Sequence, residues 1–168
     1  TVNINSNGIY TTANVELQQG VILTHRYSAN TSDPDQRFTL PNANTDTSSL
    51  VVQIQTSASS SNLHTYSVAN DTTTINSSAN VYFLEEDTDS KYRVFFGDGT
   101  IGRALTTGNI IVLKSLIADA TAPNGAKTFT PTGTVGGYSN VTVTTTSAAA
   151  GGADRDSISI IKFNAPRN

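Results

Sequence analysis

The sequence predicts an all-β fold, either an antiparallel β-sandwich or a barrel-like sheet, and two observations carry this prediction. Apolar residues recur at every second position in several short runs, which is typical of strands that bury one face. Clusters of Gly, Pro, Asn, Asp and Ser separate these runs at roughly 8–12 residues, as in sandwiches and barrels. The composition agrees, because only 36% of the 168 residues are hydrophobic, while Thr, which favours strands, and Asn and Ser, which favour turns, are abundant.

Three strand patterns lie in the first half of the chain. VILTHRY at residues 21–27 and LVVQIQ at residues 50–55 alternate between an apolar and a polar face. VYFLEE at residues 81–86 begins apolar on both faces and ends charged. We therefore expect each to be a strand that is at least half buried.

The second half contains three more patterns. Residues 110–120, IIVLKSLIADA, do not form a regular helical stripe, but every second residue from Ile111 to Ile117 lies on one strand face. NVTVTTT at residues 140–146 and SISIIKF at residues 157–163 also alternate, so we expect strands there. No segment predicts a long helix.

A change in composition near residue 100 suggests two small β-lobes with long polar loops. We expect a β-sandwich lobe at residues 1–100, followed by a second β-rich lobe, or a continuation of the first, at residues 101–168 with an arm rich in Gly and Ala. One lobe and two lobes both stay open. The chain begins at Thr1 without Met, so we interpret it as a fragment or a processed product.

The stretch FFGDGTIG predicts a structural turn formed by Gly97, Asp98, Gly99 and Gly102. A phosphate-binding loop would need a Lys and a following helix, and a helix-loop-helix calcium site would need more acidic residues. A two-residue hairpin needs only Asp-Gly, since it requires positive φ at its central positions. We interpret the stretch as a hairpin that holds two strands in register.

Charge and residue pairs argue against several function classes. The net charge is −3 and the basic residues form no stripe, which is unfavourable for nucleic acid; no apolar run approaches the ~20 residues of a membrane span. His25 and His64 lie in strand patterns, and the neighbours Glu85 and Glu86 point to opposite faces. We therefore predict no enzyme activity, no catalytic, cofactor or metal site, and no small-molecule substrate.

Three stretches together resemble a known family: RFTLPNANTDTSSLVVQ (residues 37–53), YRVFFGDGTIGRALTTGNII (residues 92–111) and GGADRDSISIIKFNAPRN (residues 151–168). They resemble the baseplate wedge protein of T-even-like contractile-tail bacteriophages, within the baseplate J-like group. In that family more protein follows the last stretch, which agrees with a fragment.

The resemblance implies a structural role in the inner ring of a phage tail baseplate. Its implied partners are other wedge proteins, hub proteins and further copies of the full-length protein, without cofactor, nucleic acid or membrane. The implied location is the virion, after assembly in the host cytoplasm. The alternative is a secreted or cell-surface β-sandwich that binds carbohydrate as an adhesin module, with six tyrosines as candidates for a sugar-stacking face. These are Tyr10, Tyr27, Tyr66, Tyr82, Tyr92 and Tyr138.

Overall fold

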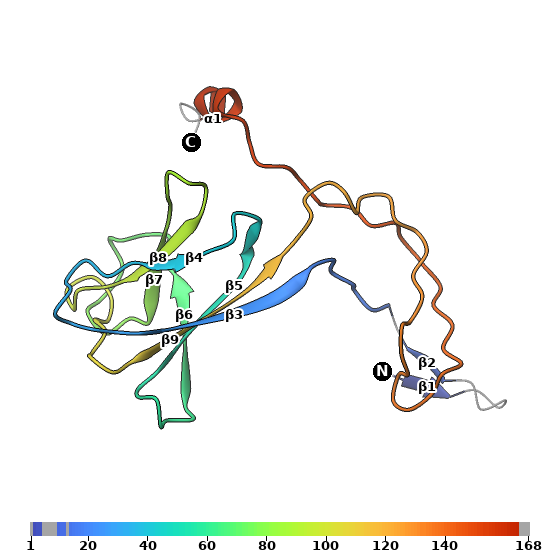
Figure 1. The fold of residues 1–168 in the computed structure, drawn as a ribbon, viewed down its shortest axis with the longest axis horizontal. Helices are drawn as coiled ribbons and strands as arrows, with labels where there is room; N and C mark the ends of the chain where they lie inside the picture. The colour runs from blue at the N-terminus through green and yellow to red at the C-terminus, as the bar shows by residue number, and fades with distance from the viewer. Residues whose placement is uncertain (1, 5–9, 13, 165–168) are drawn as a thin grey trace. The chain divides into compact units, whose positions relative to one another are not determined.

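A computed structural model describes residues 2–4, 10–12 and 14–164, and it confirms the all-β prediction (Figure 1). The chain forms two compact units. One unit is Gly20–Ala118, and the other combines Thr1–Gln19 with Asp119–Asn168. The predicted boundary at residue 100 does not match this division, because the strand that follows it belongs to the same sheet as the first half of the chain.

The unit Gly20–Ala118 is built from one seven-stranded sheet that nearly closes into a barrel. Its strand order is β3-β9-β5-β6-β7-β8-β4. All neighbours are antiparallel except β6 and β7, which pair in parallel, so the sheet is mixed and not purely antiparallel. Its near closure matches the predicted barrel-like sheet and not the predicted sandwich. The strands are β3 (Val21–Ser28), β4 (Phe38–Leu40), β5 (Thr45–Gln55), β6 (Leu63–Val68), β7 (Val81–Glu86), β8 (Tyr92–Phe96) and β9 (Ile110–Ile117).

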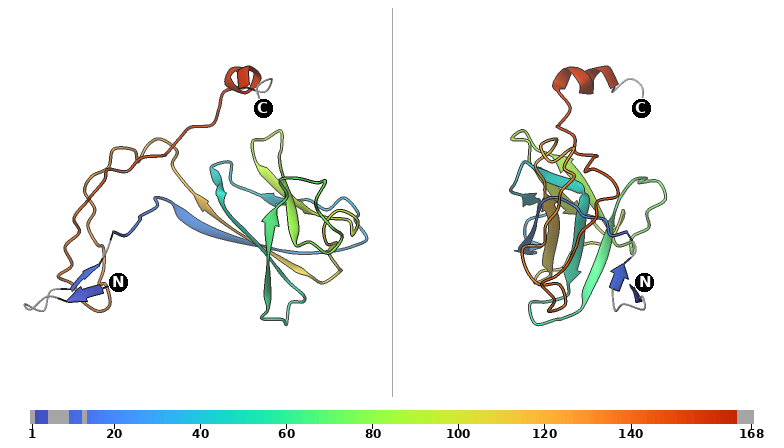
Figure 2. Two further views of the ribbon diagram at one scale, coloured as in Figure 1. Left: turned by 180° about the vertical axis from the view of Figure 1, so that it is seen from behind. Right: turned by 90° about the vertical axis from the view of Figure 1, so that its right-hand side faces the viewer.

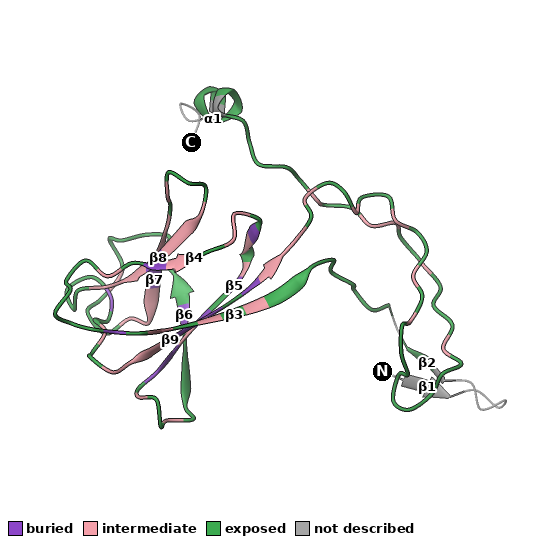
Figure 3. Cartoon of the chain, in the orientation of Figure 1, coloured by how far each residue is buried: buried purple, intermediate pink, exposed green. Residues whose placement is uncertain are grey.

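The centre of the core lies on β5 and β9 (Figure 3). Val52 lies opposite Leu113 in the antiparallel register, and Ile54 lies opposite Ile111. Val52, Ile111 and Leu113 have no solvent-exposed surface, as the alternating pattern predicts for the inner face. Cross-strand pairs of this kind are the main source of stability in a sheet.

Aromatic side chains fill the rest of the interior. The ring of Phe38 lies 5.6 Å from that of Tyr27 and 5.9 Å from that of Phe96. The ring of Tyr66 meets Phe96 edge-on at 5.5 Å, a favourable arrangement of aromatic quadrupoles. These contacts connect β3, β4, β6 and β8, so the side chains join walls of the barrel that are far apart in the sheet order.

The barrel is held together at its open seam by side chains. β4 pairs with β8 over only three residue pairs, and β3 pairs with β9, so neither pairs with the other across the seam. The Tyr27 hydroxyl on β3 donates a hydrogen bond of 2.5 Å to the Thr39 carbonyl oxygen on β4. Burial raises the pKa of Tyr27, because desolvation disfavours the charged phenolate.

The second unit contains a small hairpin, a long irregular segment and one short helix. β1 (Val2–Ile4) pairs antiparallel with β2 (Tyr10–Thr12). Residues 119–157 form no named strand, but two parts of the segment run beside each other (Figure 2). Gly125 N–H donates to the Ala149 carbonyl at 2.7 Å, and Ala149 N–H donates to Ala126 at 2.8 Å.

Two predicted strands are wrong. Residues 140–146 form no strand, because alternation supplies a face but no neighbouring backbone to pair with. The run at 157–163 instead contains the helix α1 (Ile158–Asn164). Ser157 begins this helix as its N-cap: its Oγ accepts a hydrogen bond from Ile160 N–H at 3.4 Å, and its carbonyl accepts one from Ile161 N–H at 2.9 Å.

Truncating the centre of the core should strongly destabilise the protein. We expect Leu113→Ala to lower the free energy of unfolding by about 3 kcal/mol, because it removes buried methyl groups and leaves a cavity. Urea unfolding followed by circular dichroism measures the change. The matched control is Val51→Ala on the outer face of β5, where the side chain is 40% exposed; its cost should stay below about 1 kcal/mol. Equal costs would contradict the assignment of the inner face.

The seam bond should also be measurable. Tyr27→Phe removes the donor to the Thr39 carbonyl and keeps the ring in place, so we expect a loss of about 1 kcal/mol. Tyr138→Phe is the control, since Tyr138 is 67% exposed. If both variants unfold at the same urea concentration as the wild type, the hydroxyl does not hold the seam.

Candidate functional site

The predicted turn residues form a compact loop directly after β8. The Asp98 carboxylate accepts hydrogen bonds from Thr100 N–H at 2.8 Å and from Ile101 N–H at 3.0 Å. Gly99 N–H donates to the Gly102 carbonyl at 3.0 Å. Gly99 and Gly102 have φ values of +88° and +82°, a region that glycine adopts without steric cost.

The hairpin interpretation of this turn is wrong. β8 pairs with β7 and β4, whereas β9 lies between β3 and β5, so the loop connects two different walls of the barrel. A two-residue hairpin turn is found instead at Gly136 and Gly137, whose φ values are +60° and +90°. Their neighbours Val135 and Tyr138 exchange both backbone hydrogen bonds, at 3.0 and 3.1 Å, which is the arrangement of a two-residue hairpin.

Gly97 allows the loop to fold back on itself. A Cβ at this position would lie 2.2 Å from the Ile101 carbonyl oxygen and 2.5 Å from that of Gly102. Gly97 also forms a parallel bridge with Ala104. The amides of Ile101 and Thr100 hold the pKa of Asp98 below its usual range, so this contribution to stability is present above the unfolded-state pKa and is lost as the pH falls through the folded-state pKa.

An aromatic hollow lies beside this loop on the outer face of β7 and β8. Phe83 and Phe95 stack with ring centroids 5.0 Å apart and planes inclined by 18°. The Arg37 guanidinium lies over the Phe95 ring at 4.2 Å from its centroid, a cation–π contact. The hollow has a volume of about 280 Å³ and is lined by Pro34, Asp35, Arg37, Thr72, Phe83, Phe95, Phe96, Gly97, Asp98 and Ile101.

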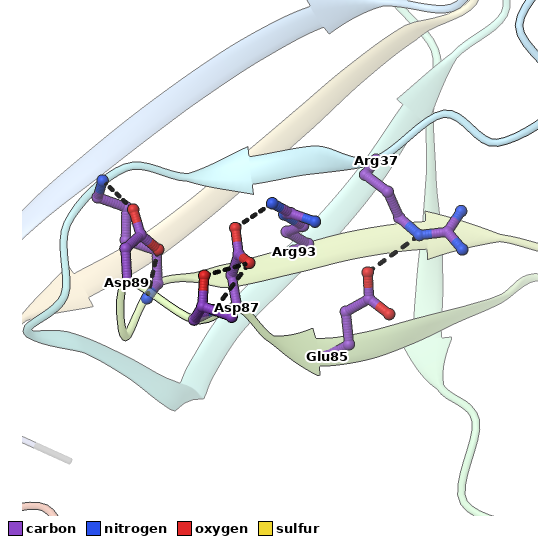
Figure 4. A network of polar contacts seen from close by, with 7 residues as sticks. Arg37, Glu85, Asp87, Asp89 and Arg93 are labelled. Atoms are coloured by element: carbon purple, nitrogen blue, oxygen red, sulfur yellow. Dashed lines mark hydrogen bonds and ion pairs between the residues drawn. The ribbon is translucent and has the colours of Figure 1, made fainter.

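Ion pairs lie along β7 and β8 and at the turn that connects them (Figure 4). Arg37 Nε lies 3.0 Å from Glu85 Oε1, and Arg93 on β8 pairs with Asp87. Lys91 Nζ lies 2.5 Å from Asp89 Oδ2. Each charge is partly exposed, so these pairs contribute little to stability. Of the paired residues, Arg37 lines the aromatic hollow.

The two histidines lie apart. His25 on β3 lies opposite Leu113 on β9, and His64 on β6 lies opposite Ile54 on β5. Two strands, β9 and β5, separate β3 from β6 in the sheet. Within the described part of the chain, no three His, Asp or Glu side chains gather as metal ligands would.

The tyrosines whose side chains the structure describes differ in burial. Tyr66 and Tyr82 are each only 5% exposed, and burial raises the pKa of Tyr82. Tyr27 and Tyr92 pack against the same core, whereas Tyr138 is exposed. The side chain of Tyr10 lies outside the described residues. Burial therefore removes the rings of Tyr66 and Tyr82 from any sugar-stacking face.

Large apolar side chains are exposed in the second unit, a feature that sequence reasoning missed. Val135 is 57% exposed and Val143 is 42% exposed, while Ile160 and Ile161 on α1 are 47% and 51% exposed. The alternating pattern at residues 140–146 predicts a buried face, so only the structure reveals that Val143 is exposed. Contiguous exposed apolar patches commonly mark interaction sites, whereas single exposed apolar residues are normal on a protein surface.

Comparison with models of known protein families and with curated proteins finds no match to this chain. Among the residues that the structure describes, no helix has the length and apolar character needed to cross a membrane.

Substitution of the turn glycines should show graded effects on stability. Gly97→Ala should cost about 3 kcal/mol, because the new methyl group meets backbone atoms that cannot move independently. Gly99→Val should lower the melting temperature because a β-branched residue is strained at positive φ, although space is available there. Gly133→Ala is the control, since a Cβ there meets nothing within 4 Å. Thermal unfolding of all three variants tests this order, and a wild-type melting temperature for Gly97→Ala would contradict the backbone contact.

Proposed function

We propose that this chain is a structural component of a phage tail baseplate, a wedge or inner-ring scaffold that mediates protein–protein assembly and catalyses no reaction. Its partners are other wedge and hub proteins and, in the full-length protein, further copies of itself. It acts in the virion after assembly in the host cytoplasm. The observation that carries the assembly role is the exposure of large apolar side chains in the second unit, including Val135 and Tyr138 at a hairpin tip and Ile160 and Ile161 on α1.

The hairpin tip at residues 135–138 presents this surface most directly. Val135 and Tyr138 are 57% and 67% exposed, and the two glycines between them fix the turn. A tip held by two backbone hydrogen bonds loses little conformational entropy on binding. Tyr is also enriched at protein interfaces.

The free edge of the barrel offers a second contact surface. β3 pairs only with β9 among the described strands, and its seam hydrogen bond to β4 lies at Tyr27, near its end. The backbone groups on the other edge at the start of β3 are therefore those that an additional strand can pair with. Val21 and Ile22 at its start are 63% and 60% exposed. An edge of this kind suits assembly by strand addition.

The stretches that resemble the wedge family support this proposal from the sequence. Residues 37–53 include β4 and most of β5, and residues 92–111 include β8 and the glycine loop. Residues 151–168 include α1. The resemblance therefore covers parts of both compact units.

A second candidate function is carbohydrate binding, which the aromatic hollow favours. Phe83 and Phe95 provide apolar ring surface, and Asp35, Asp98 and Arg37 provide polar groups at the same hollow. Sugars are bound by this combination of stacking and hydrogen bonds. A glycan array tests it: saturable binding that Phe83→Ala abolishes supports the candidate, and no binding to any glycan contradicts it.

Complementation of a phage that lacks the gene tests the assembly role. Val135→Asp places a charge on the apolar tip, and we expect a loss of infectious particles, because a buried charge without a partner weakens an interface. Thr134→Asp is the matched control, since it adds the same charge at the neighbouring exposed position. The chain should also be detected by immunogold labelling at the baseplate of wild-type virions. Virions without the chain, or full infectivity of Val135→Asp, would contradict the proposal.

A further inference from the structure

A second hollow in the barrel unit lies where the end of β5, the strand β6 and residues 103–109 meet. Its volume is about 190 Å³. It is separate from the aromatic hollow, since the two share no lining residue. The lining residues are Ile54, Thr56, His64, Tyr66, Arg103, Ala104, Thr106 and Asn109.

The lining is basic and rich in hydrogen-bond donors. It contains one guanidinium, one imidazole, one phenol, two further hydroxyl groups and one amide, and none of its residues is acidic. Such a set favours a negatively charged ligand, because donors with a positive charge nearby stabilise oxygen atoms that carry negative charge. The aromatic hollow differs, because Asp35 and Asp98 are part of its lining.

Arg103 supplies a positive charge that no carboxylate neutralises within the described residues, where Arg37 and Arg93 are paired with Glu85 and Asp87. Its guanidinium lies beside the Tyr66 hydroxyl: burial raises the pKa of Tyr66, and the charge and hydrogen bond of Arg103 act in the opposite direction. A phenol is a neutral partner, so the charge of Arg103 remains available to a ligand.

The walls of this hollow are held in place by the fold. Tyr66 is 5% exposed, and its ring packs edge-on against Phe96. The backbone N–H of Arg103 donates to the Ala79 carbonyl at 2.9 Å. These contacts fix the Tyr66 side chain and the backbone of Arg103 before a ligand arrives, which reduces the entropy lost on binding.

Asn109 joins the remaining walls. Its Nδ2 donates to the Thr56 carbonyl at 3.0 Å, and its Oδ1 accepts from Thr106 N–H at 3.0 Å. The end of β5 and the 103–109 loop are therefore linked across the hollow. The turn at residues 97–102 precedes this loop directly, so it also positions the backbone of Arg103.

We propose that this hollow is a binding site for a small oxyanion, a carboxylate or a phosphate, with Arg103 as the main ligand-binding residue and His64 and Tyr66 as further donors. The planar guanidinium matches the two oxygens of either group. The carboxylate source is an acidic side chain of a binding partner, and the phosphate source is free inorganic phosphate. This inference does not depend on the baseplate role.

Nuclear magnetic resonance titration of the ¹⁵N-labelled full chain tests the site. Sodium acetate, sodium phosphate and an acetylated Gly-Asp-Gly amide peptide are added separately, at constant ionic strength set with sodium chloride. We expect saturable shifts of the His64, Tyr66 and Asn109 amides with at least one probe. Saturation by acetate and the peptide identifies a carboxylate site, and saturation by phosphate identifies a phosphate site; both support the proposal.

Variants make this test specific. Arg103→Gln should weaken binding at least about tenfold, since it removes a charge-assisted hydrogen bond. Lys114→Gln is the control, because it removes the same charge from an exposed position outside the hollow and should bind as the wild type does. His64→Gln, at an exposed position, should weaken binding without loss of fold and replaces Arg103→Gln if that variant does not fold. No saturation by any probe up to about 50 mM, or wild-type affinity in the folded variants, would overturn the proposal.

Discussion

The burial of alternate side chains on β9 is the constraint on which the rest of the barrel depends. β9 lies between β3 and β5, and its inner face, Ile111, Leu113 and Ser115, is almost fully excluded from solvent. An apolar face of this kind must be covered on the inner side, so the sheet curls until distant strands supply the cover. The remaining gap between β3 and β4 is bridged by side-chain contacts, because β4 is too short for an extended ladder.

Because the core of the barrel unit is closed, contacts with other molecules depend on residues at the surface. The outer faces of β7 and β8 carry ion pairs that neutralise each other, and the second unit exposes apolar groups at its hairpin tip and on α1. Arg103 differs from both, because it places a charge in a hollow without acidic residues. The surface thus combines apolar groups, which favour stable contacts, with a charged site that favours specificity.

The sequence predicted the all-β class and the core strands β3, β5, β7 and β9, because period-two burial is a local signal. It gave no pattern for the short strand β4, although Phe38 and Leu40 on it are buried. It did not predict the parallel pairing of β6 with β7 or the curling of the sheet, which depend on contacts between distant residues. Alternation misled at residues 140–146, where Thr supplies little apolar surface, and at residues 157–163, where Ser157 is a helix-capping signal. Asp98-Gly99 predicted a turn. Local patterns do not reveal that this turn connects β8 and β9, which are not neighbours in the sheet, and they do not reveal the hollow around Arg103.

Amide hydrogen exchange of the full chain tests most directly the claim that β9 and β5 hold the folded unit together. Exchange from the most stable core requires global unfolding, whereas segments without regular pairing exchange through local opening. The account predicts the slowest exchange at Val112–Ser115 and Val52–Gln55, and fast exchange at residues 140–146. Equal protection of residues 140–146, or rapid exchange throughout β9, would contradict it.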